Sequence, residues 1–149
     1  MKNLLYAFSV AATAFCVQVH AETWLSASVA SYHIKRGDYC EVNPGIGFEQ
    51  SIFKDTRFVA GTYQNSLCNV SNYIGLTWAP LQFGNWRFGV ATIAITGYEN
   101  DKKKKGDEVI FAPLPMVSYE GRRWGVNLAV IPPYADFGGA IGLQGKVRF

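Results

Sequence analysis

GAIGLQGKVRF, the stretch from Gly139 to Phe149, alternates apolar residues with polar or small ones. One face of this stretch would hold its bulky apolar side chains, Ile141, Leu143, Val147 and Phe149. The other would hold its small and polar side chains, Gly142, Gln144, Lys146 and Arg148. A period of two is that of a β-strand, whose successive side chains point to opposite faces. The stretch therefore predicts a strand with one apolar and one polar surface.

The same alternation recurs upstream, and no segment after residue 21 shows a convincing helical period. We expect eight strands, at 24–32, 45–53, 57–64, 70–79, 86–97, 109–119, 123–131 and 139–149. In the fourth, Ile74, Leu76 and Trp78 oppose Gly75 and Thr77; in the first, Leu25, Ala27 and Val29 oppose Ser26 and Ser28. Apolar-out and polar-in is typical of a membrane barrel. A soluble β-sandwich gives the same alternation, so this signal leaves both open.

The lengths of the expected connections favour the barrel. Long connections at 33–44, 65–69, 98–108 and 132–138 alternate with short turns at 54–56, 81–85 and 120–122. Bacterial outer-membrane barrels have short periplasmic turns and longer outer loops, and a tilted strand needs about nine to eleven residues to cross the bilayer. We therefore predict an all-β, eight-stranded antiparallel up-and-down transmembrane β-barrel in the cell outer membrane. Its narrow interior disfavours a general diffusion pore.

The first 21 residues predict an export signal. Lys2 precedes an apolar run at 4–17, and Val19-His20-Ala21 fits the small-residue pattern that signal peptidase cleaves, with cleavage after Ala21. The run is shorter than the ~20 residues of a membrane-spanning helix. We expect residues 1–21 to be a cleaved signal peptide and 22–149 to form the barrel domain. Cys40 and Cys68 would then reach an oxidising compartment, where they either form a disulfide or stay free.

Several classes of partner are disfavoured by composition. The 14 basic and 11 acidic residues are too evenly balanced to predict nucleic-acid binding. The sequence has no nucleotide-binding glycine loop, no His/Cys cluster with metal spacing and no G-x-S-x-G elbow. We expect no cofactor, no metal and a monomer. The terminal Phe149 resembles the signal by which the barrel-assembly machinery recognises its clients, so we expect that machinery as a partner.

The predicted topology gathers three polar residues at the outer rim. His33 ends the first strand, and Asn65 and Ser66 follow the third. A histidine near a serine can act as a general base for acyl transfer. The alternative is a rim histidine that only forms hydrogen bonds in the headgroup zone.

Short motifs across the chain add a family resemblance. They are Ser31-Tyr32-His33, Tyr39-Cys40-Glu41, Pro44-Gly45-Ile46-Gly47-Phe48, Tyr63-Gln64-Asn65-Ser66, Pro115-Met116-Val117-Ser118 with Gly121, Asn127, Ile131-Pro132 and Arg148-Phe149. In this order they resemble the outer-membrane lipid A palmitoyltransferase family, over nearly the whole mature chain. The resemblance implies an eight-stranded barrel that moves a palmitoyl chain from a phospholipid to lipid A. It implies a catalytic histidine at His33 and a serine at Ser66, with phospholipid and lipid A as partners.

The chain departs from the family in two respects. Asn65 stands where the family has an aspartate, and an amide does not stabilise an imidazolium as a carboxylate does. The first long loop carries two carboxylates, Asp38 and Glu41, either of which could take the place of the missing aspartate. The family's N-terminal amphipathic helix is missing, because the first strand starts at Trp24. We keep His33, Ser66 and Asn65 as candidate catalytic residues.

Two further features admit two interpretations each. Pro113 and Pro115 interrupt the expected sixth strand, and Pro132-Pro133 end the seventh. Since proline lacks a backbone donor, these positions either form a seam that admits a lipid tail or merely end the pairing. The run Lys102–Lys105 either contacts lipid A phosphates or belongs to a solvated loop.

Three functions follow, in this order. The first is a non-catalytic outer-membrane barrel with a structural or surface-interaction role. The second, close behind, is a lipid A acyltransferase-like enzyme or lipid hydrolase. The third is a soluble periplasmic carrier.

Overall fold

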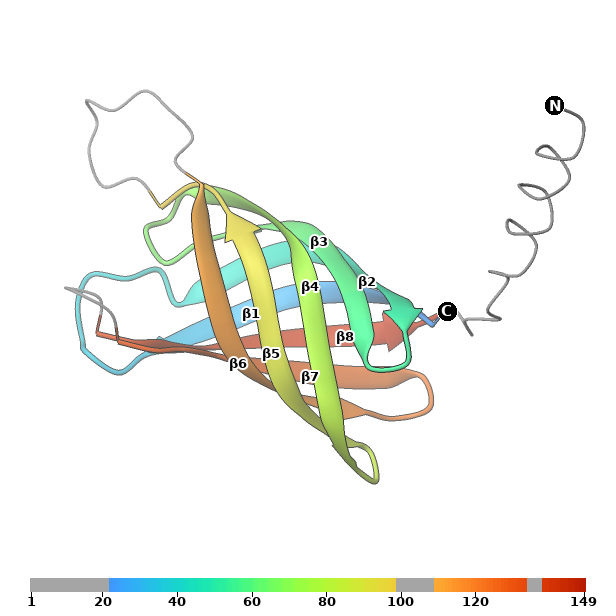
Figure 1. Ribbon diagram of the computed structural model, residues 1–149. Helices are drawn as coiled ribbons and strands as arrows, with labels where there is room; N and C mark the ends of the chain where they lie inside the picture. The colour runs from blue at the N-terminus through green and yellow to red at the C-terminus, as the bar shows by residue number, and fades with distance from the viewer. Residues whose placement is uncertain (1–21, 99–108, 134–137) are drawn as a thin grey trace, which may run out of the picture.

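The computed structural model describes residues 22–98, 109–133 and 138–149, which form one closed antiparallel barrel (Figure 1). Its strands are β1 (Thr23–His33), β2 (Val42–Phe53), β3 (Thr56–Gln64), β4 (Val70–Phe83), β5 (Trp86–Ile95), β6 (Ile110–Glu120), β7 (Trp124–Ile131) and β8 (Ala140–Arg148). Each pairs with the next along the chain, and β8 pairs with β1. The all-β, eight-stranded antiparallel barrel expected from the sequence is confirmed. The expected signal peptide (1–21) and the run Lys102–Lys105 lie outside the described residues.

The predicted alternation sets the two sides of the wall. On β8, Ile141 and Leu143 point outward and are each 39% exposed, whereas Lys146 points inward and is 4% exposed. Ile74 on β4 and Leu25 on β1 likewise lie on the outside, as expected. Among the described residues, no helix is long and apolar enough to cross a membrane.

The two ends of the barrel differ in their connections. At what we call the terminal end, β1 begins and β8 ends, with Trp24 paired to Arg148 (Figure 1). The three short turns, at 54–55, 84–85 and 121–123, also lie at this end. The opposite end, where β1, β3 and β5 finish, is called the loop end. Short turns and long connections therefore alternate as the sequence predicted.

Two strand boundaries correct the sequence-based expectation. The expected turn at 81–85 is shorter, because β4 continues to Phe83 through a register shift between Trp78 and Leu81. A two-residue turn follows, in which Gly84 has a φ of +58°. β5 ends at Ile95, two residues earlier than expected, and Gly97 just beyond has a φ of +88°.

The prolines of β6 act differently from the prediction. β6 runs unbroken through Pro113 and Pro115 and pairs with β5 along its length, so the expected interruption is wrong. In the described chain, β6 pairs with β7 only at 116–120. Glu120 donates its N–H toward β5 and Gly121 donates toward β7, so odd-numbered positions of β6 face β7. The prolines occupy the positions whose N–H would have bonded β7, which leaves a seam there.

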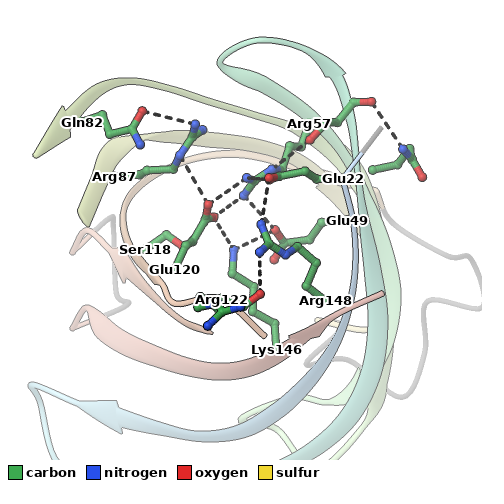
Figure 2. A network of polar contacts seen from close by, with 12 residues as sticks. Glu22, Glu49, Arg57, Gln82, Arg87, Ser118, Glu120, Arg122, Lys146 and Arg148 are labelled. Atoms are coloured by element: carbon green, nitrogen blue, oxygen red, sulfur yellow. Dashed lines mark hydrogen bonds and ion pairs between the residues drawn. The ribbon is translucent and has the colours of Figure 1, made fainter. Parts of the chain in front are cut away.

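A buried charge cluster occupies the lumen at the terminal end (Figure 2). Its members are Glu22, Glu49, Arg57, Arg87, Glu120, Lys146 and Arg148. Lys146 donates to Glu49 at 3.0 Å and to Glu120 at 2.8 Å. Arg57 bonds the same two carboxylates. Each buried charge thus has opposite charges in contact, which offsets its loss of hydration.

Trp24 lies inside this cluster and is fully buried. Lys146 Nζ is 4.8 Å from the ring centroid, and the guanidinium carbons of Arg148 and Arg57 are 5.5 and 6.0 Å from it. Cations over an indole face are attracted by its quadrupole. The indole therefore belongs to the polar cluster, although its first-strand position alone predicted only a strand start.

Toward the loop end, the lumen becomes apolar on the side of β5 to β8. A buried cluster of Ala91, Leu114 and Met116 packs against Ile93, Ala112, Ala129 and Ile131. Gly142 of β8 faces the lumen here, and a Cβ added to it would lie 3.9 Å from Ile131 Cδ1 and 4.0 Å from the Ala129 carbonyl oxygen, in ordinary van der Waals contact. The lumen therefore has room for a methyl group beside Gly142. The β1 to β4 side at this end is polar and carries the candidate site.

Candidate functional site

A β-bulge aims His33 into the lumen. Ser28 and Ala30 pair with successive residues of β8, so the register shifts at Val29. An extra residue of this kind inverts the in-out alternation beyond it. After the bulge, Tyr32 points outward and is 59% exposed, whereas His33 is 3% exposed. Without the bulge, His33 would lie on the same outer face as Val29.

The first loop covers the imidazole of His33. Tyr39 stacks on it with ring centroids 4.0 Å apart and an interplanar angle of 14°. Glu41 Oε1 lies 3.9 Å from His33 Nδ1. Of the two carboxylates proposed from the sequence as a replacement partner, Glu41 is therefore the one placed beside the histidine. No described contact joins Asp38 to it.

Ser66 is buried beside the same loop. Its carbonyl accepts a hydrogen bond from the Cys40 N–H at 2.9 Å. A disulfide joins Cys40 to Cys68 across a Cα–Cα distance of 5.5 Å, which decides between the two states left open by the sequence. Because Tyr39 and Cys40 are consecutive, the segment that stacks on His33 is also the one bonded to Ser66. The first and second loops are thus fastened together at the candidate site.

Tyrosine hydroxyls complete the polar group. The Tyr98 hydroxyl forms a hydrogen bond with the Tyr63 hydroxyl at 2.9 Å and lies near Ser66. Tyr63 also lies near Ser71. Burial raises the pKa of the Tyr98 phenol above its ordinary value, against the opposing effect of its hydrogen bonding, so this neighbour of Ser66 stays neutral. Sequence reasoning missed Tyr98, although its place just after β5, at the end where Ser66 lies, was a usable signal.

Asn65 is fully buried and uses its whole side-chain amide in hydrogen bonds. Its Nδ2 donates to Ser71 Oγ at 2.9 Å and to the Gly97 carbonyl at 2.6 Å. Its Oδ1 accepts from the N–H groups of Leu67 at 2.9 Å and Asn69 at 3.1 Å. These bonds shape the second loop and fix it to the end of β5. The contacts of Asn65 are therefore those of a residue that positions the loop carrying Ser66.

Replacing Asn65 with aspartate is expected to lower the free energy of unfolding by about 2 kcal/mol or more. The carboxylate would face the Gly97 carbonyl, an acceptor to which it has no proton to donate, and would depend on the Ser71 hydroxyl turning its proton toward it. Urea unfolding in detergent, followed by tryptophan fluorescence, measures the change. The matched control is Asn72→Asp, an exposed position where we expect less than about 0.5 kcal/mol. Equal stability of Asn65→Asp and the native chain would contradict the assigned role.

Chemically, the site offers a histidine with a nearby carboxylate and a buried serine near a neutral phenol. Among the described residues, no group of three or more His, Cys, Asp or Glu side chains is placed to hold a metal ion. His33, Ser66 and Asn65 all lie at the loop end, as expected from the sequence. His33 and Ser66 both contact the segment at Tyr39 and Cys40. Asn65 fixes the second loop, which carries Ser66, to the Gly97 carbonyl.

Comparison with known proteins leaves the chain without an assigned family. No family model matches it, and no curated protein matches it either. Among solved structures, it is similar to the Yersinia pestis outer membrane protein Ail in a phospholipid bilayer nanodisc. The identity is 12% and the TM-score 0.44, over 87% of this chain and 100% of that one. The fold assignment therefore rests on the strand pairing of this chain itself.

Proposed function

We propose that this chain is an outer-membrane protein that holds the acyl chain of an outer-leaflet lipid in its lumen and transfers that chain to lipid A. The observation that carries the proposal is the division of the lumen at the loop end. The lumen has an apolar side, with room for a methyl group at Gly142, and a polar side with His33 and Ser66. This arrangement suits a molecule with a hydrocarbon tail and an ester group.

The outer wall supports placement in a membrane. Bulky apolar side chains are exposed around the ring, for example Ile46, Ile74, Val90 and Ile141. Exposure of this apolar surface to water is unfavourable in free energy, whereas contact with lipid tails removes that penalty. We expect the protein in the sedimenting membrane fraction, resistant to extraction by urea. Recovery from the soluble periplasm would contradict the location.

The proposed reaction uses His33 as general base. An acceptor hydroxyl of lipid A attacks the carbonyl carbon of a phospholipid ester, and His33 takes its proton. The bond between the carbonyl carbon and the glycerol oxygen then breaks, and the proton passes to that oxygen. Glu41 favours the transient imidazolium from 3.9 Å, and Ser66 orients the ester. The products are acylated lipid A and a lysophospholipid.

Mass spectrometry of lipids from cells with and without the gene tests this function. We expect a lipid A species heavier by one acyl chain, together with an equivalent amount of lysophospholipid. A rise in lysophospholipid and free fatty acid alone would identify a hydrolase. Unchanged lipid A and unchanged phospholipids would contradict both activities.

Gly142→Leu is expected to lower transfer of the native acyl length at least about 10-fold, because its side chain projects into the lumen. Shorter donor chains should then be preferred. The matched control is Gly145→Leu, on the same strand but facing outward, where an added Cβ meets nothing within 4 Å. Mass spectrometry of the transferred chains from mixed-length phospholipids gives the distribution. An identical distribution in both variants would contradict the assigned acyl position.

A second candidate is a non-catalytic barrel that binds a surface partner. It is favoured by Asn65, whose amide is fully used in holding the second loop and takes no part beside the imidazole. In that case His33→Ala would leave both lipid profiles and surface binding unchanged.

A further inference from the structure

A groove of about 370 Å³ lies on the outer wall near the terminal end. It is lined by Trp86, Val117, Tyr119, Trp124, Val126 and Leu128. These residues alternate with lumen-facing neighbours such as Ser118, which is 1% exposed, so the groove faces outward. Its volume lies within the range of roughly 300–1,000 Å³ usual for small-molecule sites.

The polarity of the groove lining decreases with distance from the turns. Trp86 pairs with Tyr119 next to the turns, and their ring centroids are 5.1 Å apart. The ring of Trp124 lies 5.3 Å from Tyr119. Val117 and Leu128 pair with each other two positions further from the turns. An amphipathic aromatic cluster at the edge and aliphatic side chains beyond it match the polarity of a lipid that enters tail first.

The adjoining turn carries unbalanced positive charge. Arg122 and Arg123 are both exposed, and no described acidic side chain contacts either guanidinium. Glu120, the nearest carboxylate in sequence, points into the lumen and is held there by Arg57 and Lys146. The turn itself is fixed, because the Arg122 carbonyl accepts a hydrogen bond from the Arg148 guanidinium (Figure 2). Arg123 directly precedes the groove residue Trp124, so the two exposed arginines lie on the turn that adjoins the apolar groove. Guanidinium groups bind phosphate with charge-assisted hydrogen bonds.

We propose that this groove and turn form a specific site for an anionic glycerophospholipid of the periplasmic leaflet. One acyl chain lies over Val117, Val126 and Leu128, and the phosphate lies against Arg122 and Arg123. The site is on the opposite side of the wall, and at the opposite end of the barrel, from His33. It rests on the proposed membrane location but not on acyl transfer.

Native mass spectrometry of the full chain, extracted from membranes into a lipid-free neutral detergent, tests the site. Phosphatidylglycerol and phosphatidylcholine with identical acyl chains are titrated separately. We expect one tightly held phosphatidylglycerol per barrel and weaker retention of phosphatidylcholine. Each of Arg122→Gln and Arg123→Gln should weaken phosphatidylglycerol binding about 5-fold. Val126→Trp, which fills the groove, should weaken binding of both lipids.

The matched control is Lys54→Gln, which removes one exposed positive charge from the turn between β2 and β3 at the same end. Unchanged affinity in this control supports the site, whereas a loss equal to that of Arg123→Gln would overturn it. Equal affinity for the two lipids, or a dimer that excludes lipid from the groove, would also overturn it. If no lipid binds to the groove of a barrel that still transfers acyl chains, the groove site is overturned and the proposed acyl transfer is not.

Discussion

Lys146→Met is expected to lower the free energy of unfolding by about 3 kcal/mol, the low end of the cost of removing one partner from a buried ion pair, because Arg57 still contacts both carboxylates. The Lys146 side chain has 0% exposure and contacts Glu49 and Glu120 at 3.0 and 2.8 Å. Methionine fills similar volume but leaves both carboxylates short of one positive charge. The same change also removes the cation over the Trp24 ring.

Urea unfolding of the folded barrel in detergent, read by tryptophan fluorescence, measures this effect. Lys54→Met, at an exposed turn position, is the control and should change stability by less than about 0.5 kcal/mol. Adding Glu49→Gln to Lys146→Met should recover part of the loss, since one unpaired charge is then removed. The role given to the cluster fails if Lys146→Met and Lys54→Met have equal stability.

His33→Ala is expected to reduce acyl transfer by about 10²- to 10⁴-fold, the usual contribution of a general base. The buried imidazole is the proton acceptor of the proposed reaction, and alanine offers no substitute. Glu41→Gln should cost less, because Glu41 is 56% exposed and lies 3.9 Å from the ring. Mass spectrometry of lipid A and lysophospholipid reports the rate.

Tyr32→Ala serves as the control for His33→Ala, because Tyr32 is the preceding residue but points outward. It should retain acyl transfer within a few-fold of the native chain. Folding of every variant is checked by its heat-dependent mobility in gel electrophoresis. Full transfer by a folded His33→Ala variant would favour the non-catalytic barrel instead.

The strands were predictable because each outer face is apolar over most of its length. In β8, Ile141 and Lys146 end up on opposite sides as a period of two requires. The end of β4 was not predictable in the same way. Pro80 and Leu81 look like the start of a turn, but a register shift lets the ladder continue to Phe83. Local sequence does not record such a shift, because the partner strand determines it.

The position of the candidate site was predictable, but its geometry was not. Topology brought His33, Asn65 and Ser66 to one end of the barrel. The bulge at Val29 makes the His33 side chain point into the lumen, and no residue type in β1 predicts that bulge. Alternation continued from Leu25 would have placed His33 on the outer face.

The role of Asn65 was hidden for a different reason. Its amide bonds the Gly97 carbonyl, 32 residues away in the chain, so its function lies in the folded state. From the sequence, it was interpreted as a lost aspartate. The charge cluster was likewise predictable only in part. Alternation in the last strand places Lys146 and Arg148 on the polar face, but it does not identify their acidic partners, which are distant in the sequence.

Closure of the barrel between β1 and β8 imposes an order on biosynthesis. The sealing ladder joins Trp24 to Arg148, so it must wait until the last strand has been translated. A chain that lacks 140–148 would leave the edges of β1 and β7 unpaired, and unpaired strand edges are templates for aggregation. Closure of the ring and completion of the last strand are therefore the same event in this fold.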